Sequence, residues 1–293
     1  MVSVIILTYN RYNLLSKTLK SVLGQTYKDL EVLIINDGSN DDTAQITKIF
    51  DDKRLRLFNL EKQNNLAKLR NIGVLNAMGE YIAFCDDDDL WVSNKLEIQF
   101  EYLKRYDFVC TNAKLINIDD EVVDEKYIKK SKSFIIKTEL LIQDNMVLPS
   151  SVIFKKQILN TNAPFDEINF INLCEDYNLW IKLSMKNELF FLNEQTISHR
   201  THNSWARSFD HTKEIFNNHV RLIKPFTKSK DKCLKNTAFL SILNTKFYSL
   251  KYFISNKKYI IFTKEFFKFI FIFKNPFYMK SLYEKIKNQV LRK

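Results

Sequence analysis

The stretch Glu80–Trp91 reads EYIAFCDDDDLW, and the interpretation of the whole chain starts from it. A mostly apolar run of strand length, as in a strand buried in a parallel sheet, leads directly into four aspartates, Asp86 to Asp89. Like charges this close repel one another unless a cation lies among them. Mg²⁺ is usually held by one or two carboxylates together with substrate phosphates. The stretch predicts a metal-dependent ligand site at the carboxyl end of a strand, with a solvated acidic loop as the alternative.

Strand and helix patterns alternate through the first ninety residues. Short apolar runs predict strands, and apolar residues at helical spacing predict the segments between them. This order is typical of a doubly wound α/β fold with a mostly parallel sheet. The predicted strands are Val2–Leu7, Leu30–Asn36, Arg54–Leu60 and the run from Tyr81, and the predicted helices are Tyr12–Leu23, Thr43–Phe50 and Leu66–Met78.

The segment after Trp91 carries weaker patterns. We expect a helix over Ser93–Lys104, followed by two strands, Tyr106–Thr111 and Lys114–Ile118. The charged segment Asp119–Ser133 is predicted to be a loop.

Glycine content restricts how a phosphate can be bound. The chain has four glycines, and they form neither GxGxxG nor GxxxxGK[ST]. Dinucleotide-binding loops and P-loops need glycines so that the backbone can approach phosphate closely. We therefore expect any phosphate to be held by a metal ion and by side chains such as Arg70.

Cysteine use and the chain start bear on the compartment. Four scattered cysteines form no CxxC pair, which favours reduced thiols and a cytoplasmic protein. No signal peptide is expected, because the start of the chain has no basic region and its apolar run leads directly into a turn. No apolar run approaches the ~18 residues that span a bilayer.

The charge is concentrated at the carboxyl end. Residues 211–293 carry 19 Lys and Arg against four Asp and Glu, whereas residues 1–210 have a net charge of −4. Within this tail, one predicted helix face carries Phe262, Phe266, Phe269 and Phe273, with lysines nearly opposite. Such a basic amphipathic helix can lie on an anionic membrane surface, or it can pack against protein. Nucleic acid is not expected as a partner, because no nucleic-acid-binding motif accompanies the charge.

Several of these segments together resemble the family 2 glycosyltransferases with the GT-A fold. The resemblance covers about residues 1–205 and implies a catalytic domain over 1–210 and a separate basic, helical tail over 211–293. Within the catalytic domain, 1–91 would bind the nucleotide sugar and 92–210 would form the acceptor side. The segments that carry the resemblance are VIILTYNR (4–11), VLIINDGS (32–39), LRNIG (69–73), GEYIAFCDDDDLW (79–91) and CEDYNLW (174–180).

The family resemblance implies a role for each site residue. Asp88 would be the metal ligand of a DxD motif for Mn²⁺ or Mg²⁺, Asp86 would hold metal or ribose, and Asp176 would be the catalytic base. His202 would be a further metal ligand, with an ordinary hydrogen-bonding role as its alternative. The residues expected to contact the nucleotide sugar are Thr8, Tyr9, Arg11, Asp37, Arg70, Asp86 and Asp87.

Structural explanations exist for three of these residues. Asp37-Gly38 alone is an ordinary turn, acids such as Asp176 are favoured in the first turn of any helix, and Arg70 could lie on a helix surface. The order in which these residues accompany the aspartate run favours the functional interpretation.

The resemblance implies inverting transfer of a hexose or N-acetylhexosamine from a nucleotide sugar, expected to be UDP-linked. The acceptor would be a hydroxyl of a growing, lipid-linked surface glycan, which places the protein on the cytoplasmic face of the membrane. Homo-oligomers are compatible with these features. The alternatives are a sugar-phosphate nucleotidyltransferase, a glycoside hydrolase with two carboxylates, and a non-catalytic membrane- or glycan-binding protein.

Overall fold

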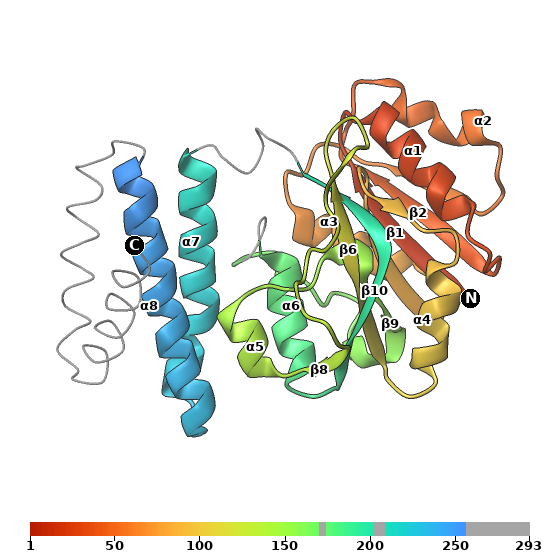
Figure 1. Cartoon of the computed structure of the whole chain (residues 1–293). Helices are drawn as coiled ribbons and strands as arrows, with labels where there is room; N and C mark the ends of the chain where they lie inside the picture. The colour runs from red at the N-terminus through yellow and green to blue at the C-terminus, as the bar shows by residue number, and fades with distance from the viewer. Residues whose placement is uncertain (170–173, 202–208, 256–293) are drawn as a thin grey trace. The chain divides into compact units, whose positions relative to one another are not determined.

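The computed structural model describes residues 1–169, 174–201 and 209–255 (Figure 1). The chain divides into two compact units, Met1–Ala206 and Arg207–Lys293, which are described separately below.

The first unit is built on a curled sheet flanked by helices (Figure 1). Its amino-terminal half is parallel, in the order β3-β2-β1-β4. β1, β2 and β4 are short apolar runs with little exposed surface, as expected of strands covered on both faces, whereas β3, at the end of this order, is only partly buried. These strands are β1 (Val2–Thr8), β2 (Leu30–Asn36), β3 (Leu55–Asn59) and β4 (Tyr81–Asp86).

The register of these strands places their polar carboxyl ends at one edge of the sheet. Thr8 pairs with Asn36, and Leu7 pairs with Asp86. The residues that follow β1, β2 and β4 in the sequence therefore meet there, where ligands usually bind in open α/β sheets.

The sheet continues through strands of mixed direction. β9 is antiparallel to both β4 and β6, β6 and β10 are parallel, and β10 is antiparallel to β5 and β8. A short strand, β7, pairs with β6. Their bounds are β5 (Leu90–Trp91), β6 (Phe108–Ile116), β7 (Val122–Asp124), β8 (Phe134–Ile136), β9 (Ile153–Lys155) and β10 (Leu189–Arg200).

Helices cover both faces of the parallel half. Val4 and Ile6 of β1 point to one face and join the core made with α1 and α4. On the opposite face, Gly73 of α3 packs so closely on Ile5 that a Cβ at Gly73 would lie 2.4 Å from the Ile5 side chain. The α-helices of this unit are α1 (Tyr12–Leu23), α2 (Ile46–Phe50), α3 (Leu66–Asn76), α4 (Lys95–Leu103), α5 (Thr138–Gln143) and α6 (Glu175–Ser184).

Three details differ from the sequence predictions. The two strands predicted between Tyr106 and Ile118 are one continuous strand, β6, because the buried side chain of Asn112 bonds the backbone of Ile128 and does not form a turn. The loop predicted over Asp119–Ser133 contains β7. The helix predicted over Thr43–Phe50 is a 3₁₀ turn, η1 (Asp42–Gln45), followed by the short α2.

Within residues 209–255, the described part of the second unit, two α-helices are joined by a basic segment. α7 (Phe209–Ile223) leads through the 3₁₀ segment η5 (Lys224–Lys228) into α8 (Lys232–Ser255). The phenylalanines predicted on one helix face, 262–273, lie outside the described residues. No helix in the described part is both long enough and apolar enough to cross a bilayer. Five exposed side chains, called here the α7–α8 lysines, are Lys224, Lys228, Lys230, Lys232 and Lys235.

Candidate active site

The four aspartates form a tight turn at the end of β4. The backbone N–H of Asp86 donates to the Ser150 hydroxyl at 2.9 Å, and the N–H of Asp89 donates to the Asp86 carbonyl at 3.2 Å. Asp87, Asp88 and Asp89 are all buried. The turn therefore holds several carboxylates in a confined space instead of exposing them to water, which argues against a solvated acidic loop.

Arg11, from the loop after β1, holds two of these acids. Its Nη1 donates to Asp87 Oδ1 at 2.9 Å and to Asp88 Oδ2 at 2.6 Å. This contact brings the predicted nucleotide-binding loop and the aspartate turn together, although they are 76 residues apart.

Burial and mutual repulsion raise the pKa values of two aspartates. Burial raises the pKa of Asp86 to about 6, with Asp89 and Asp88 adding to the shift and Arg70 opposing it. Burial raises the pKa of Asp87 to about 7, against the charge of Arg11 and the nearby Thr8 hydroxyl. A nearby cation would stabilise the ionised form of these two carboxylates, because an opposite charge lowers the pKa of an acid.

This donor set fits a divalent cation that receives part of its coordination from substrate. No group of three or more His, Cys, Asp or Glu side chains in the described part of the chain is arranged as a metal site. Mg²⁺ needs only one or two carboxylates when phosphates supply further oxygens. Asp88 and Asp86 can provide these carboxylates, provided that Arg11 moves away from Asp88 or shares it.

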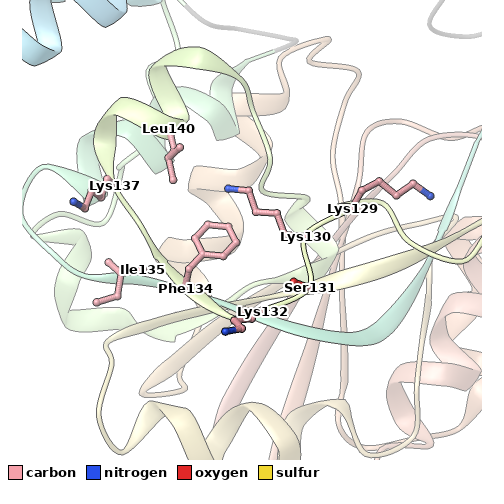
Figure 2. A pocket seen from close by; sticks show the side chains of 8 residues that line it. All are labelled: Lys129, Lys130, Ser131, Lys132, Phe134, Ile135, Lys137 and Leu140. Atoms are coloured by element: carbon pink, nitrogen blue, oxygen red, sulfur yellow. The ribbon is translucent and has the colours of Figure 1, made fainter.

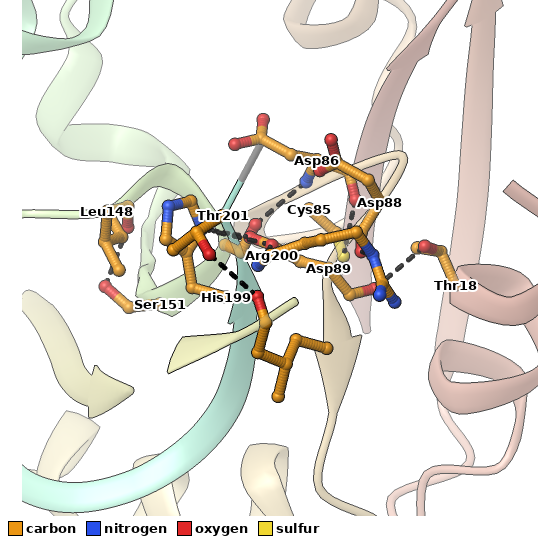
Figure 3. A network of polar contacts seen from close by, with 12 residues as sticks. Thr18, Cys85, Asp86, Asp88, Asp89, Leu148, Ser151, His199, Arg200 and Thr201 are labelled. Carbon is orange, nitrogen blue, oxygen red and sulfur yellow. Dashed lines mark hydrogen bonds and ion pairs between the residues drawn. The ribbon is translucent and has the colours of Figure 1, made fainter. Parts of the chain in front are cut away.

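Asp89 fixes the turn to β10 (Figure 3). Its buried carboxylate accepts from the backbone N–H of Arg200 at 2.9 Å and lies 3.1 Å from His199 Nδ1. The Arg200 side chain donates through Nε to the Asp88 carbonyl at 2.9 Å, and the Thr18 hydroxyl donates to the Asp89 carbonyl at 2.8 Å. Asp89 thus organises the backbone on which Asp88 is presented.

His199 lies beside the aspartates, and their charges favour its protonated form. Burial alone would lower its pKa, but Asp89, and then Asp86 and Asp88, raise the pKa to about 9. The sequence interpretation preferred His202, which lies outside the described residues.

Asp176 lies at the start of α6, and Arg70 connects this helix to β4. Arg70 is buried; its Nε donates to Glu175 Oε1 at 3.1 Å, and its Nη2 lies 3.6 Å from Asp86 Oδ1. Arg70 therefore connects the end of β4 to the start of α6, although Glu175 lies 105 residues further along the chain than Arg70.

The electrostatic environment of Asp176 suits a general base. Burial, followed by the charge of Glu175, raises the pKa of Asp176 to about 7; Asp86 adds to the shift and Arg70 opposes it. A base works best when its pKa lies near the working pH. The side chain can thus hold or release a proton near neutrality.

The predicted base-binding residues surround a lysine that the sequence interpretation missed. Lys62 Nζ lies 3.1 Å from Asp37 Oδ2 and 2.7 Å from the centroid of the Tyr9 ring. Asp37 also accepts from the backbone N–H of Gln63 at 2.6 Å. Asp37 therefore organises the turn that carries Lys62, and its contact with a nucleotide base stays a prediction.

Comparison with known protein families identifies the fold and the family. The model of the family described as glycosyl transferase family 2 matches residues 3–162. An uncharacterized glycosyltransferase of Rickettsia conorii is 37% identical over 192 residues, covering 64% of this chain and 31% of that protein. The chain spans less than a third of the length of this protein and of its relatives from R. felis and R. bellii.

A relative of more similar length comes from Escherichia coli. WfgD, named UDP-Glc:alpha-D-GlcNAc-diphosphoundecaprenol beta-1,3-glucosyltransferase, is 32% identical over 195 residues, covering 66% of this chain and 73% of WfgD.

Solved structures of TarS from S. aureus share the fold. The structure of TarS 1-349 superposes with a TM-score of 0.64 at 21% identity, covering 84% of this chain and 72% of that one. A second structure, TarS 1-349 in complex with UDP-GlcNAc, gives a TM-score of 0.64 at 18% identity, covering 83% and 71%. The chain therefore belongs to glycosyl transferase family 2 and has the GT-A fold that the family resemblance implied.

Proposed function

We propose that this chain transfers a hexose or N-acetylhexosamine from a UDP-linked sugar to a hydroxyl of a growing, lipid-linked surface glycan. Transfer would depend on Mn²⁺ or Mg²⁺ and would invert the anomeric centre. The observation that carries the proposal is Arg70, which contacts both Asp86 and Glu175 and so places the end of β4 beside the start of α6.

The donor side of the reaction is assigned to the aspartate turn. Asp88 and Asp86 would hold the cation, which when bound neutralises charge on the diphosphate leaving group. Arg11 is close enough to both Asp87 and Asp88 to exchange its carboxylate contacts for donor phosphate oxygens. Lys62 and Tyr9 would line the nucleotide side, with Asp37 fixing the turn that carries Lys62.

The acceptor side is assigned to Asp176. Its carboxylate would accept the proton of the attacking hydroxyl, and its pKa of about 7 leaves it partly ionised at neutral pH. One base opposite one leaving group supports a single displacement, which inverts the anomeric centre. Most of the remaining task is to hold hydroxyl, anomeric carbon and leaving oxygen in line.

The donor and acceptor classes are supported by what the relatives are named for. WfgD is named for UDP-Glc and a diphosphoundecaprenol-linked acceptor, and TarS was crystallised with UDP and UDP-GlcNAc. For this chain we infer a UDP-sugar and a lipid-linked acceptor of the same chemical classes.

A position on the cytoplasmic membrane surface follows from the acceptor. The α7–α8 lysines are all exposed and lie between Lys224 and Lys235, in η5 and at the start of α8. Each lysine near an anionic bilayer contributes about 1 kcal/mol of attraction, so five can hold a protein at the surface without a membrane-spanning helix.

The proposal is tested by assaying transfer from a panel of UDP-sugars to a synthetic saccharide linked through diphosphate to a lipid. Product should form with Mn²⁺ or Mg²⁺, disappear with EDTA, and have the opposite anomeric configuration to the donor. Release of pyrophosphate would instead identify a nucleotidyltransferase, and retained configuration would refute the single displacement.

A further inference from the structure

A basic groove lies on the half of the catalytic unit assigned to the acceptor (Figure 2). It has a volume of about 560 Å³ and is largely open to solvent. Four lysines lie around an apolar floor, and none of the lining residues is acidic. This lysine groove is lined by Lys129, Lys130, Ser131, Lys132, Phe134, Ile135, Lys137 and Leu140.

The lining combines positive charge with a fixed apolar surface. All four lysines are exposed; Lys129 pairs with Asp124, and the variants described below target Lys130, Lys132 and Lys137. Lys130 Nζ lies 4.1 Å from the centroid of the Phe134 ring.

The floor of the groove is anchored to the core of the sheet. The Phe134 ring packs on Phe191 of β10, with the centroids 4.9 Å apart. Ile135, next along β8, keeps 38% of its surface exposed. A ligand that fits this lining carries an anionic group joined directly to an apolar chain.

Both walls of the groove are attached to the candidate active site. One wall continues from Tyr127, whose ring lies 6.4 Å from that of His199, the partner of Asp89. The other wall belongs to α5, where the carbonyl of Leu141 accepts from the hydroxyl of Tyr177, the residue after Asp176. The groove is therefore built from segments that also support both groups of site acids.

We propose that the lysine groove binds the phosphate groups of the lipid-linked acceptor, while Phe134, Ile135 and Leu140 contact the first carbons of its lipid. Lysine is an effective point charge for phosphate, and the residues that line the groove include no acid, although Asp124 pairs with Lys129 beside it. The donor diphosphate is assigned elsewhere, to the aspartate turn. This inference rests on the proposed function, because it names where the acceptor of that reaction is held.

Farnesyl diphosphate is the probe, because it carries a diphosphate on an isoprenoid chain and needs no sugar. Its binding to the full chain is measured by calorimetry without donor or metal. We compare a groove variant, K130Q/K132Q/K137Q, with a matched control, K20Q/K53Q/K186Q, which removes three exposed lysines outside the groove. Removing three exposed charge contacts should weaken binding about tenfold in the groove variant and leave the control unchanged.

Three further probes separate the groove from other anion effects. Inorganic pyrophosphate and farnesol should each bind at least about tenfold more weakly than farnesyl diphosphate, because each lacks half of the proposed recognition. I135T should weaken farnesyl diphosphate binding without affecting pyrophosphate. Equal losses in groove and control variants, or equal affinity for pyrophosphate and farnesyl diphosphate, would overturn the proposal. It would also be overturned if the groove variant lost affinity for phosphatidylglycerol vesicles but not for farnesyl diphosphate.

The outcome for the groove is separable from the outcome for the transferase. UDP binding with Mn²⁺ should be the same in the groove variant and the wild type. In turnover assays the groove variant should raise KM for the lipid-linked acceptor with little change in kcat. Farnesyl diphosphate binding that depends on the groove lysines, in a protein that turns over no UDP-sugar, would support the groove and refute the proposed reaction. Normal acceptor KM in the groove variant would refute the groove alone.

Discussion

Replacing Asp176 by Asn should remove the base and, with it, the pH dependence of transfer. The side chain keeps its size and can still accept from the backbone N–H of Tyr177, which lies 2.7 Å from Oδ1. Loss of a positioned general base typically lowers the rate by about 10²–10⁴-fold. UDP binding should be nearly unchanged, because the donor is assigned to the aspartate turn.

The pKa of Asp176 sets the expected pH profile. With a pKa of about 7, the carboxylate is half ionised at pH 7, and only about 1% remains ionised at pH 5. In the wild type, kcat/KM for the acceptor at saturating donor should therefore fall about fiftyfold between pH 7 and pH 5 through this group alone. The direction follows because only the deprotonated form can take a proton.

The assay measures initial rates of transfer from pH 5 to 8 with a non-titrating lipid-linked acceptor. E101Q, which neutralises an exposed acid on α4, is the matched control and should keep the wild-type profile. Residual activity of D176N should lack the rise near pH 7. An unchanged rate in D176N, or a flat wild-type profile, would refute the base assignment.

Three other predictions concern Arg11, Lys95 and the α7–α8 lysines. R11A should tighten Mn²⁺ binding measured without nucleotide, because Asp87 and Asp88 lose their internal cation; unchanged or weaker binding would argue against a metal there. Burial lowers the pKa of Lys95 in the folded chain to about 7. Above pH 7 the unfolded chain therefore binds more protons than the folded chain, and the stability of the fold should rise with pH. In urea unfolding, the free energy of unfolding of the wild type should rise by about 2–3 kcal/mol more than that of K95M between pH 7 and pH 9. The same pH dependence in both proteins would contradict this prediction. Changing the α7–α8 lysines to Gln should reduce sedimentation with phosphatidylglycerol vesicles, and undiminished sedimentation would refute a membrane role for these lysines.

The parallel half of the fold was predictable because its signals are local. β1, β2 and β4 are compact apolar runs, and the bounds of α1 match the helix predicted over Tyr12–Leu23. Interior strands of a parallel sheet need apolar side chains on both faces, so their sequence pattern is unambiguous.

Elements after Trp91 depend on contacts that the sequence does not display. Asn112 favours a turn by composition, yet its side chain is buried and bonds the backbone of Ile128, which allows β6 to continue. The segment Asp119–Ser133 was predicted to be a loop but contains β7. This strand forms by pairing with β6, a tertiary contact that the local sequence pattern does not show.

The site showed the same division between local and distant signals. Asp86 to Asp89 could be picked out as site residues because four acids follow an apolar strand. Asp176 was picked out because it lies in the segment CEDYNLW, which resembles a family motif. The contact between Arg70 and Glu175 joins two residues that are 105 apart in the sequence, and the pattern of neither segment predicts the contact. Lys62 was missed and His199 was ranked below His202, because the contacts of each depend on a partner from another segment, Asp37 for Lys62 and Asp89 for His199.

Calorimetry of UDP binding tests most directly whether the aspartate turn holds a metal–nucleotide complex. The wild type should bind UDP with Mn²⁺ and lose most of this affinity when EDTA is added. D88N should bind UDP weakly in both conditions, while D42N, which neutralises an exposed acid in η1, should match the wild type. Identical Mn²⁺-dependent affinity in D88N and the wild type would contradict a metal site at the aspartate turn and, with it, the proposed reaction.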